Sequence, residues 1–435
     1  MILVYTHKIT PRVTYIFKHV FERMLGGKVG FTTKVEEFIA HKGTKLSYTR
    51  QQLGNEFFIK NHELLFEQGI TDFDIKVQQW DGLPAFFSTS DKSALPYDIF
   101  AASFFLLSRY EEYFPYVGDA FGRFPAKESI AHQNDFLEVP VVDLWVGRLK
   151  ETILARFPDT EFQAKNYHFL PIIEVPSAFT YIKKGILRTL AGTLLDLFSF
   201  RLRRVVDRLA VLLGLRRDPA NNFSRYTVLH QQYGVKAIFF FLVSDFSAYD
   251  HPISYNNNKF RSIVKSVSDY DQVALLNSFD SSERPEQLMT ERKRLEELVH
   301  KDIKQTRCHM GNLSIPEKYR QLVDAEFSED YSMSYANVHG FRAGTSSPFL
   351  FYDIGGEMQL PIKVFSPCTS SYLLHKLGHV TKIQERLTGF YNTIGAVNGH
   401  FIITLRNTTI AEVNDAIRWR ELYIETLKNY VRFEK

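Results

Sequence analysis

Two histidines, His375 and His379, have the spacing HxxxH, the most direct hint of chemistry in the chain. On a helix this spacing places two imidazoles on one turn, where they can bind a metal ion. No acidic residue follows the first histidine and no third ligand is evident, so the pattern favours an ordinary surface helix. The sequence has no P-loop, no GxGxxG, no GxSxG and no CxxC pair.

The composition is typical of a soluble globular protein, and it excludes several classes. Of the 435 residues, 45% are hydrophobic and 23% charged, a balance that excludes disordered and collagen-like chains. The net charge of +4 is too small to predict nucleic-acid binding. Two cysteines, no signal peptide and no run of about 20 apolar residues together predict a cytoplasmic protein without a membrane span.

The first 157 residues predict a small α+β module, followed by a polar linker at 158–168. Apolar residues at helical spacing mark its helices, and glycines at 26 and 27 end the first of them. The predicted elements are a strand at 1–5, at the edge of a sheet, and helices at 13–25, 98–113 and 141–157.

From residue 169 the pattern changes to strands alternating with helices. The run AIFFFLV (237–243) is so apolar that both faces must be covered, as in a parallel sheet. Such alternation predicts a parallel α/β sheet or a (β/α) barrel over 169–435. Ser314 and Glu317 predict a capping box, with Pro316 in the first helical turn. The predicted strands are 169–175, 236–243, 272–276, 331–335, 362–365 and 401–405.

A basic amphipathic segment at 186–217 interrupts this alternation. Leucine, valine and phenylalanine recur at helical spacing, while Arg201, Arg204 and Arg208 lie on the opposite face. Seven arginines stand against two aspartates. Such a helix pair binds either an anionic membrane surface or a protein partner. The alternative is that it packs on its own domain and exposes its basic face to water.

Over nearly its whole length the sequence resembles a polysaccharide-deacetylase-like family of Bacteroidetes-type bacteria. In that family an N-terminal module precedes a NodB-type domain of carbohydrate esterase family 4. The strings that carry the resemblance are YTHKITPR near the start, SRYEEY (108–113), GRFPA (122–126), VVDLW (141–145), IFFFLVSDF (238–246), NKFRS (258–262), DYSMSYA (330–336) and GFRAGTSSPFLFYD (340–353). The resemblance implies a distorted (β/α) barrel preceded by the smaller α+β module.

Working members of this family remove N-acetyl groups from carbohydrate. The resemblance implies a divalent metal, such as zinc, held by one aspartate and two histidines, with an aspartate as base and a histidine as acid. In this sequence Glu174 stands at the base position and Arg406 at the acid position. Pro176 and Leu276 stand at two metal-ligand positions, and only His309 matches a ligand.

These departures predict lost catalysis. One imidazole cannot hold a divalent cation at useful affinity, and arginine cannot donate a proton at neutral pH. The sequence therefore predicts no metal and a pseudoenzyme that acts by binding or assembly, at a membrane surface if residues 186–217 bind lipid. The alternatives are an active metal-dependent carbohydrate N-deacetylase with a rearranged site, and an interaction module in envelope-polysaccharide synthesis or secretion.

Two hypotheses concern the vacated site. In the first, Arg406 replaces the charge of the lost cation and pairs with Glu174, rather than both being solvated at a pocket rim. In the second, Arg342, Arg406 and His309 form a cationic site for an acidic sugar or a phosphate. Phe279 and Phe341 would then offer stacking faces, unless the pocket is filled and inert.

Overall fold

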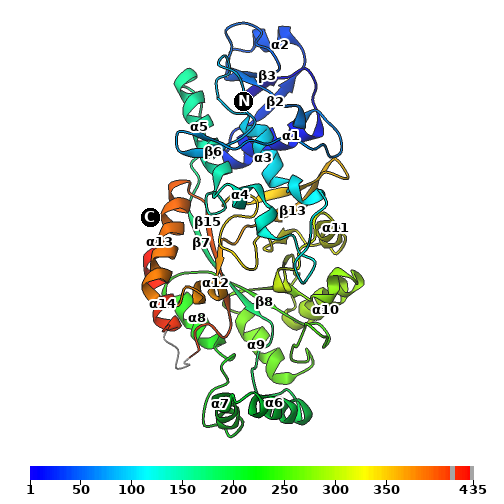
Figure 1. Ribbon diagram of the computed structural model, residues 1–435, viewed down its shortest axis with the longest axis vertical. Helices are drawn as coiled ribbons and strands as arrows, with labels where there is room; N and C mark the ends of the chain where they lie inside the picture. The colour runs from blue at the N-terminus through cyan, green and yellow to red at the C-terminus, as the bar shows by residue number, and fades with distance from the viewer. Residues whose placement is uncertain (412–416, 432–435) are drawn as a thin grey trace. The chain divides into compact units, whose positions relative to one another are not determined.

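A computed structural model describes residues 1–411 and 417–431, which form two compact units. The first unit comprises Met1–His168, Leu313–Cys368 and Thr388–Phe401. The second comprises Phe169–Asn312, Thr369–Leu387 and Ile402–Lys435. Both are α/β structures with parallel strands (Figure 1). The predicted division into 1–157, 158–168 and 169–435 stays a prediction.

A four-stranded parallel sheet organises the N-terminal part of the first unit. Its order is β2-β1-β3-β4. The strands are β1 (Ile2–Tyr5), β2 (Val29–Thr32), β3 (Lys45–Thr49) and β4 (Phe58–Lys60). The predicted edge position of the first strand is wrong, because β1 lies between β2 and β3. Those two short neighbours contain glycine, lysine and serine, so they lack the apolar run that reveals a buried strand.

The predicted helices of this unit are present, and those predicted at 98–113 and 141–157 are shorter than expected. The first continues α1 (Pro11–Lys18) through a π-helical turn at His19–Met24. The helix α3 (Ile99–Leu107) is buried along its whole length, so its apolar residues occur on every face. The others are α2 (Val35–Ala40), α4 (Ile130–Gln133) and α5 (Val141–Arg156), with the hairpin β5 (Gln78–Trp80) and β6 (Leu83–Ala85).

Later segments of the first unit add α11 (Glu317–Asp324) and the strands β12 (Phe349–Asp353), β13 (Met358–Val364) and β11 (Glu329–Asp330), in that strand order. The predicted strand at 331–335 is wrong. The strand ends at Asp330, whose carboxylate accepts from the backbone and the hydroxyl of Ser332 and turns the chain. The predicted capping box is also wrong, since no side chain caps α11.

The second unit is built on a parallel sheet with the strand order β10-β9-β8-β7-β15-β14. Every residue of β8 (Ile238–Phe241) is buried between β7 (His168–Val175) and β9 (Gln272–Asn277), as its composition predicts. The other strands are β10 (Gln305–Cys308), β14 (Thr369–Ser370) and β15 (His400–Arg406). The strand pairings of the described residues do not show the closed barrel that the resemblance implies.

Helices connect these parallel strands, and a last helix, α14, follows the final strand β15. They are α6 (Ile186–Phe198), α7 (Leu202–Leu212), α8 (Phe223–Gln232), α9 (Asn258–Ser268), α10 (Glu286–Val299), α12 (Ser371–His375), α13 (Val380–Ala396) and α14 (Trp419–Tyr430). His375 ends α12, and a turn through Gly378 separates it from α13, so His375 and His379 do not share a helical turn. No helix among the described residues is long and apolar enough to cross a membrane.

Candidate functional site

Glu174 lies near the carboxyl end of β7 and is almost fully buried, with 8% of its surface exposed. Arg307, on β10, donates from Nε to Glu174 Oε1 at 2.7 Å. Arg406, at the end of β15, places Nε 3.9 Å from Glu174 Oε2. Glu174 and Arg406 therefore lie within ion-pairing distance, as the first hypothesis expects, but Arg307 is the closer partner. Sequence reasoning missed Arg307, whose nearest signal is its position two residues before His309.

The two arginines change what Glu174 can do. Burial alone would raise the pKa of this carboxyl, but Arg307 first and Arg406 second outweigh burial and hold the pKa below its ordinary value. Glu174 is therefore ionised at neutral pH, yet it is a weak base. A carboxylate this well paired is poorly suited to accept a proton from water.

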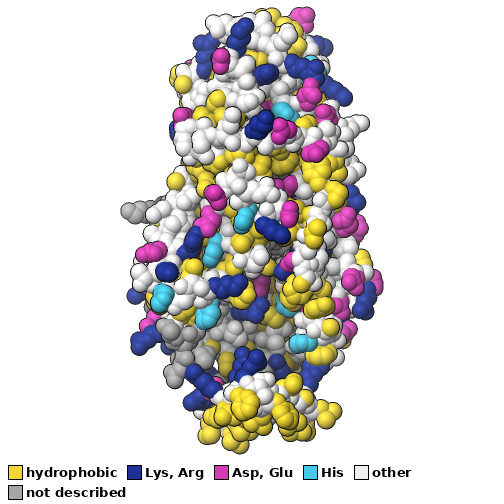
Figure 2. Space-filling view, in the orientation of Figure 1, with side chains coloured by type: hydrophobic (Ala, Val, Ile, Leu, Met, Phe, Trp, Pro, Cys, Tyr) yellow, Lys and Arg dark blue, Asp and Glu magenta, His cyan; other side chains and the backbone are white. Residues whose placement is uncertain are grey.

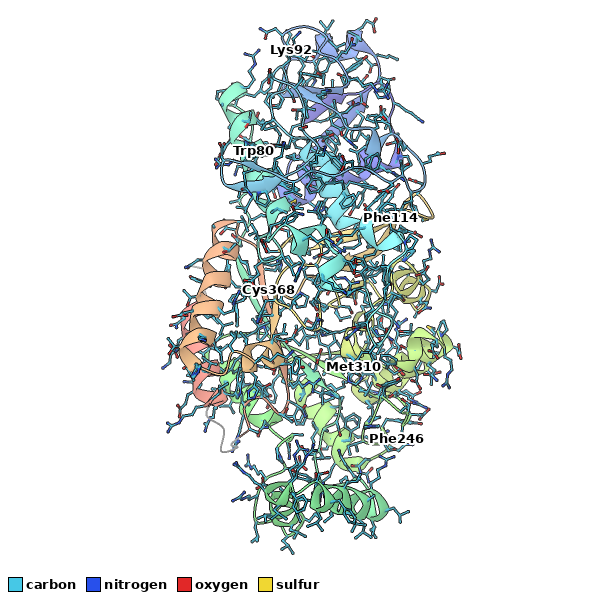
Figure 3. All side chains as sticks on the ribbon, viewed as in Figure 1. Trp80, Lys92, Phe114, Phe246, Met310 and Cys368 are labelled. Carbon is cyan, nitrogen blue, oxygen red and sulfur yellow. The ribbon has the colours of Figure 1, made fainter. Side chains whose placement is uncertain are left out.

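His309 follows β10 directly and is held by a second carboxylate. Its Nδ1 lies 2.7 Å from Asp250 Oδ1, and both residues are buried. The next residue, Met310, labelled in Figure 3, has a left-handed backbone with φ 56°, which turns the chain sharply after the histidine. His309 also helps to lower the pKa of Glu174, so these groups share one electrostatic environment.

The residues of this site do not fit the divalent metal that the resemblance implies. Pro176 follows β7 and has no side-chain donor atom, and Leu276 is fully buried on β9. Glu174 is engaged by arginine, which leaves His309 as the one matching ligand. No group of three or more histidine, cysteine, aspartate or glutamate side chains within residues 1–411 and 417–431 could hold a metal ion. Structural and catalytic metal sites need at least three protein ligands.

Arg342 belongs to the first unit, where it forms an ion pair with Glu112. Its guanidinium donates to both carboxylate oxygens of Glu112, and only 2% of the residue is exposed. Phe341 is fully buried and packs edge-on against Phe390, and Phe279 lies against Tyr249. We therefore leave Arg342 and these two phenylalanines out of the candidate binding site.

A small pocket adjoins Arg406. It has a volume of about 230 Å³ and lies beside the loop that follows β15. Trp419, Tyr372 and His375 supply aromatic surface, and Ser371, Thr408 and Thr409 supply hydroxyls. The backbone of Arg406 is fixed, because its N–H donates to Thr409 Oγ1 and its carbonyl accepts from Tyr226 Oη. The side chain of Arg406 itself stays about half exposed, at 53%.

Comparisons with known proteins give one family match and distant similarities to solved structures. Residues 2–158 match a family of unknown function, DUF7033. No curated protein matches the sequence. A solved structure from Mycobacterium smegmatis, named as a polysaccharide deacetylase, is 13% identical with a TM-score of 0.39, covering 61% of this chain and 86% of that chain. A 4-alpha-glucanotransferase from Thermococcus litoralis is 11% identical with a TM-score of 0.35, covering 61% of this chain and 37% of that chain. Neither similarity bears on function.

Proposed function

We propose that this protein is a deacetylase-like pseudoenzyme that binds an acidic carbohydrate without hydrolysing it. The observation that carries the proposal is the ion pairing of Glu174 with Arg307 and Arg406. Two fixed positive charges beside this carboxylate supply the charge that a cation would otherwise supply. They also repel a metal ion and hold the carboxylate in its ionised form.

The ligand class follows from the pocket beside Arg406. A half-exposed guanidinium recognises carboxylate, sulfate or phosphate oxygens through charge-assisted hydrogen bonds. Trp419 and Tyr372 offer flat surfaces for the apolar face of a sugar ring, and the hydroxyls around them match sugar hydroxyls. A volume of about 230 Å³ suits one or two sugar units, so a trisaccharide would enter with its terminal units.

Trp419 provides a direct readout of binding. The chain has three tryptophans, and Trp419 alone lines this pocket. We expect trigalacturonic acid to change its fluorescence, and neutral galactotriose to bind at least tenfold more weakly. Arg406→Gln should weaken binding of the acidic sugar by about tenfold or more, because one charge-assisted contact contributes about 1.5–3 kcal/mol.

Two variants serve as controls for this titration. Arg418→Gln removes a nearby exposed arginine that pairs with Glu421 and does not line the pocket, so binding should be unchanged. Trp419→Phe should abolish the fluorescence change. Equal affinity for acidic and neutral trisaccharides, or full affinity in Arg406→Gln, would count against the proposal.

The second candidate is a metal-dependent N-deacetylase with a rearranged site. One observation favours it: Asp250 orients His309 through Nδ1, as carboxylates orient metal-bound histidines, and Nε2 has no hydrogen-bond partner among the described residues. We expect protein purified with added zinc, then dialysed, to contain far less than one metal ion per chain. It should release no acetate from tri-N-acetylchitotriose. Stoichiometric metal that is lost in His309→Ala, together with acetate release, would establish the enzyme instead.

A further inference from the structure

The hairpin formed by α6 and α7 turns its apolar face outward. In a helix packed on its own domain the leucines and valines are buried, but here the opposite holds. Figure 2 shows hydrophobic side chains gathered over these two helices. The outward residues are at least 40% exposed: Ile186, Leu187, Leu190, Leu194, Leu195, Leu197, Phe198, Phe200, Leu202, Val206, Leu209, Leu212, Leu213 and Leu215.

The inward face of the hairpin is polar and clamps the two helices together. Asp196, one of only two buried residues described for α6 and α7, pairs with Arg208 at 2.5 Å. Arg208 also donates to Thr193 Oγ1, and its guanidinium lies over the ring of Tyr181. Arg208 was predicted to face a membrane or partner. Its side chain is only 11% exposed and instead holds the two helices together through its ion pair with Asp196.

The hairpin also carries several exposed arginines. Arg201 and Arg204 lie at the start of α7, Arg217 lies beyond its end, and all three are exposed. Arg188, on α6, lies 3.7 Å from the ring centre of Phe246, a residue labelled in Figure 3. Only Asp196 and Asp207 oppose the seven arginines of residues 186–217, and both are already paired. The hairpin therefore combines a broad apolar surface with a net positive charge.

This combination fits an anionic lipid bilayer better than a protein surface. A second copy of the chain would bring two arginine-rich borders together, which is repulsive. A bilayer accepts broad apolar insertion from both helices and their turn at once, and its anionic headgroups attract the exposed, long-stemmed arginines. Phe198 and Phe200, at the turn, are 81% and 87% exposed and can enter the acyl boundary.

We propose that the α6–α7 hairpin docks this protein on an anionic bilayer, lying in the interface without crossing the membrane. The docking surface consists of the outward apolar residues, assisted by the exposed arginines Arg188, Arg201, Arg204 and Arg217. Because it shares no residue with the pocket beside Arg406, membrane docking is independent of sugar binding.

Flotation of the full-length protein with vesicles tests this inference. We expect it to float with vesicles of 70% phosphatidylcholine and 30% phosphatidylglycerol, and to float weakly with phosphatidylcholine alone. Arg201→Gln/Arg204→Gln should reduce partitioning into anionic vesicles about tenfold or more, whereas Arg201→Lys/Arg204→Lys should retain most of it. Leu187→Asn/Phe198→Asn/Phe200→Asn should abolish flotation. All three side chains are more than 80% exposed, so this variant should keep the native circular dichroism and thermal midpoint.

Three results would overturn the inference. The first is wild-type protein that stays at the bottom of the gradient with anionic vesicles. The second is flotation that the asparagine variant leaves unchanged. The third is a dimer that light scattering detects without lipid in the wild type but not in the asparagine variant, while neither protein floats. A second copy of the chain would then cover the apolar face.

Discussion

Replacing Glu112 with alanine is expected to lower the free energy of unfolding by about 3–5 kcal/mol, because two buried guanidinium groups lose their shared carboxylate. Arg342 donates to both oxygens of Glu112, and Arg109 donates from Nε at 2.7 Å. Arg109 is fully buried, and Glu112 is 5% exposed. Arg109 also donates to the carbonyl of Arg342, so the cluster joins chain segments about 230 residues apart within the first unit.

Urea denaturation followed by tryptophan fluorescence measures this effect. In a Trp419→Phe background the remaining tryptophans, Trp80 and Trp145, both belong to the first unit and report its unfolding. Arg342→Met should destabilise comparably. The double variant Glu112→Leu/Arg342→Met should cost clearly less than the sum of the single variants, since it removes both charges together. Additive effects, or a loss below about 1 kcal/mol for Glu112→Ala, would show that this cluster is not a structural ion pair.

The same cluster predicts an acid limit to stability. Burial alone would raise the pKa of Glu112, but Arg342 and Arg109 outweigh it and hold the pKa below its ordinary value of 4.5. The stabilisation is therefore present above pH 4.5 and is lost as the pH falls through the lowered pKa. As the pH falls below 4.5, the free energy of unfolding should therefore decrease less in Glu112→Ala than in the wild type.

Asp98 is expected to have the opposite effect of pH on stability from Glu112: it stabilises the fold more at low pH, and its effect changes over a higher pH range. Its carboxylate caps α3 by accepting from the N–H groups of Phe100 and Ala101. It also accepts from Tyr48 Oη at 2.5 Å and from the N–H of His62 at 2.7 Å. Burial dominates these hydrogen bonds and raises its pKa from 3.8 to about 6. This difference corresponds to about 3 kcal/mol between the two protonation states.

Because the pKa is higher in the folded state, Asp98 contributes fully to stability below pH 3.8 and loses that contribution as the pH rises through 6. The stability of wild type relative to Asp98→Asn should therefore increase by about 2–2.5 kcal/mol between pH 7 and pH 4, measured by the same urea denaturation. Tyr48→Phe removes the hydrogen bond that most lowers the pKa of Asp98, so it should move this transition to higher pH. A difference that stays constant from pH 4 to pH 7 would contradict the assignment.

Sequence reasoning located elements with strong local signals and failed where the signal was weak. The buried strand at β8 and the helices α3 and α5 were predicted because their apolar residues form long runs or helical repeats. The strands β2 to β4 were missed because they are short and partly polar. The pocket of Trp419 and Tyr372 was missed as well, since its members come from separate segments with no common motif.

By itself, the sequence determined which side chains can act as ligands and which segment is amphipathic. The side chains of Pro176 and Leu276 lack donor atoms in any fold, and helical periodicity is a local property of the chain. Only the tertiary structure decided which partner each charge takes, because Arg342 with Glu112 and Arg307 with Glu174 are distant in sequence. Periodicity also shows that two faces of a helix differ, but not which one meets water. Folding alone turned the leucines of α6 and α7 outward and the aspartate inward.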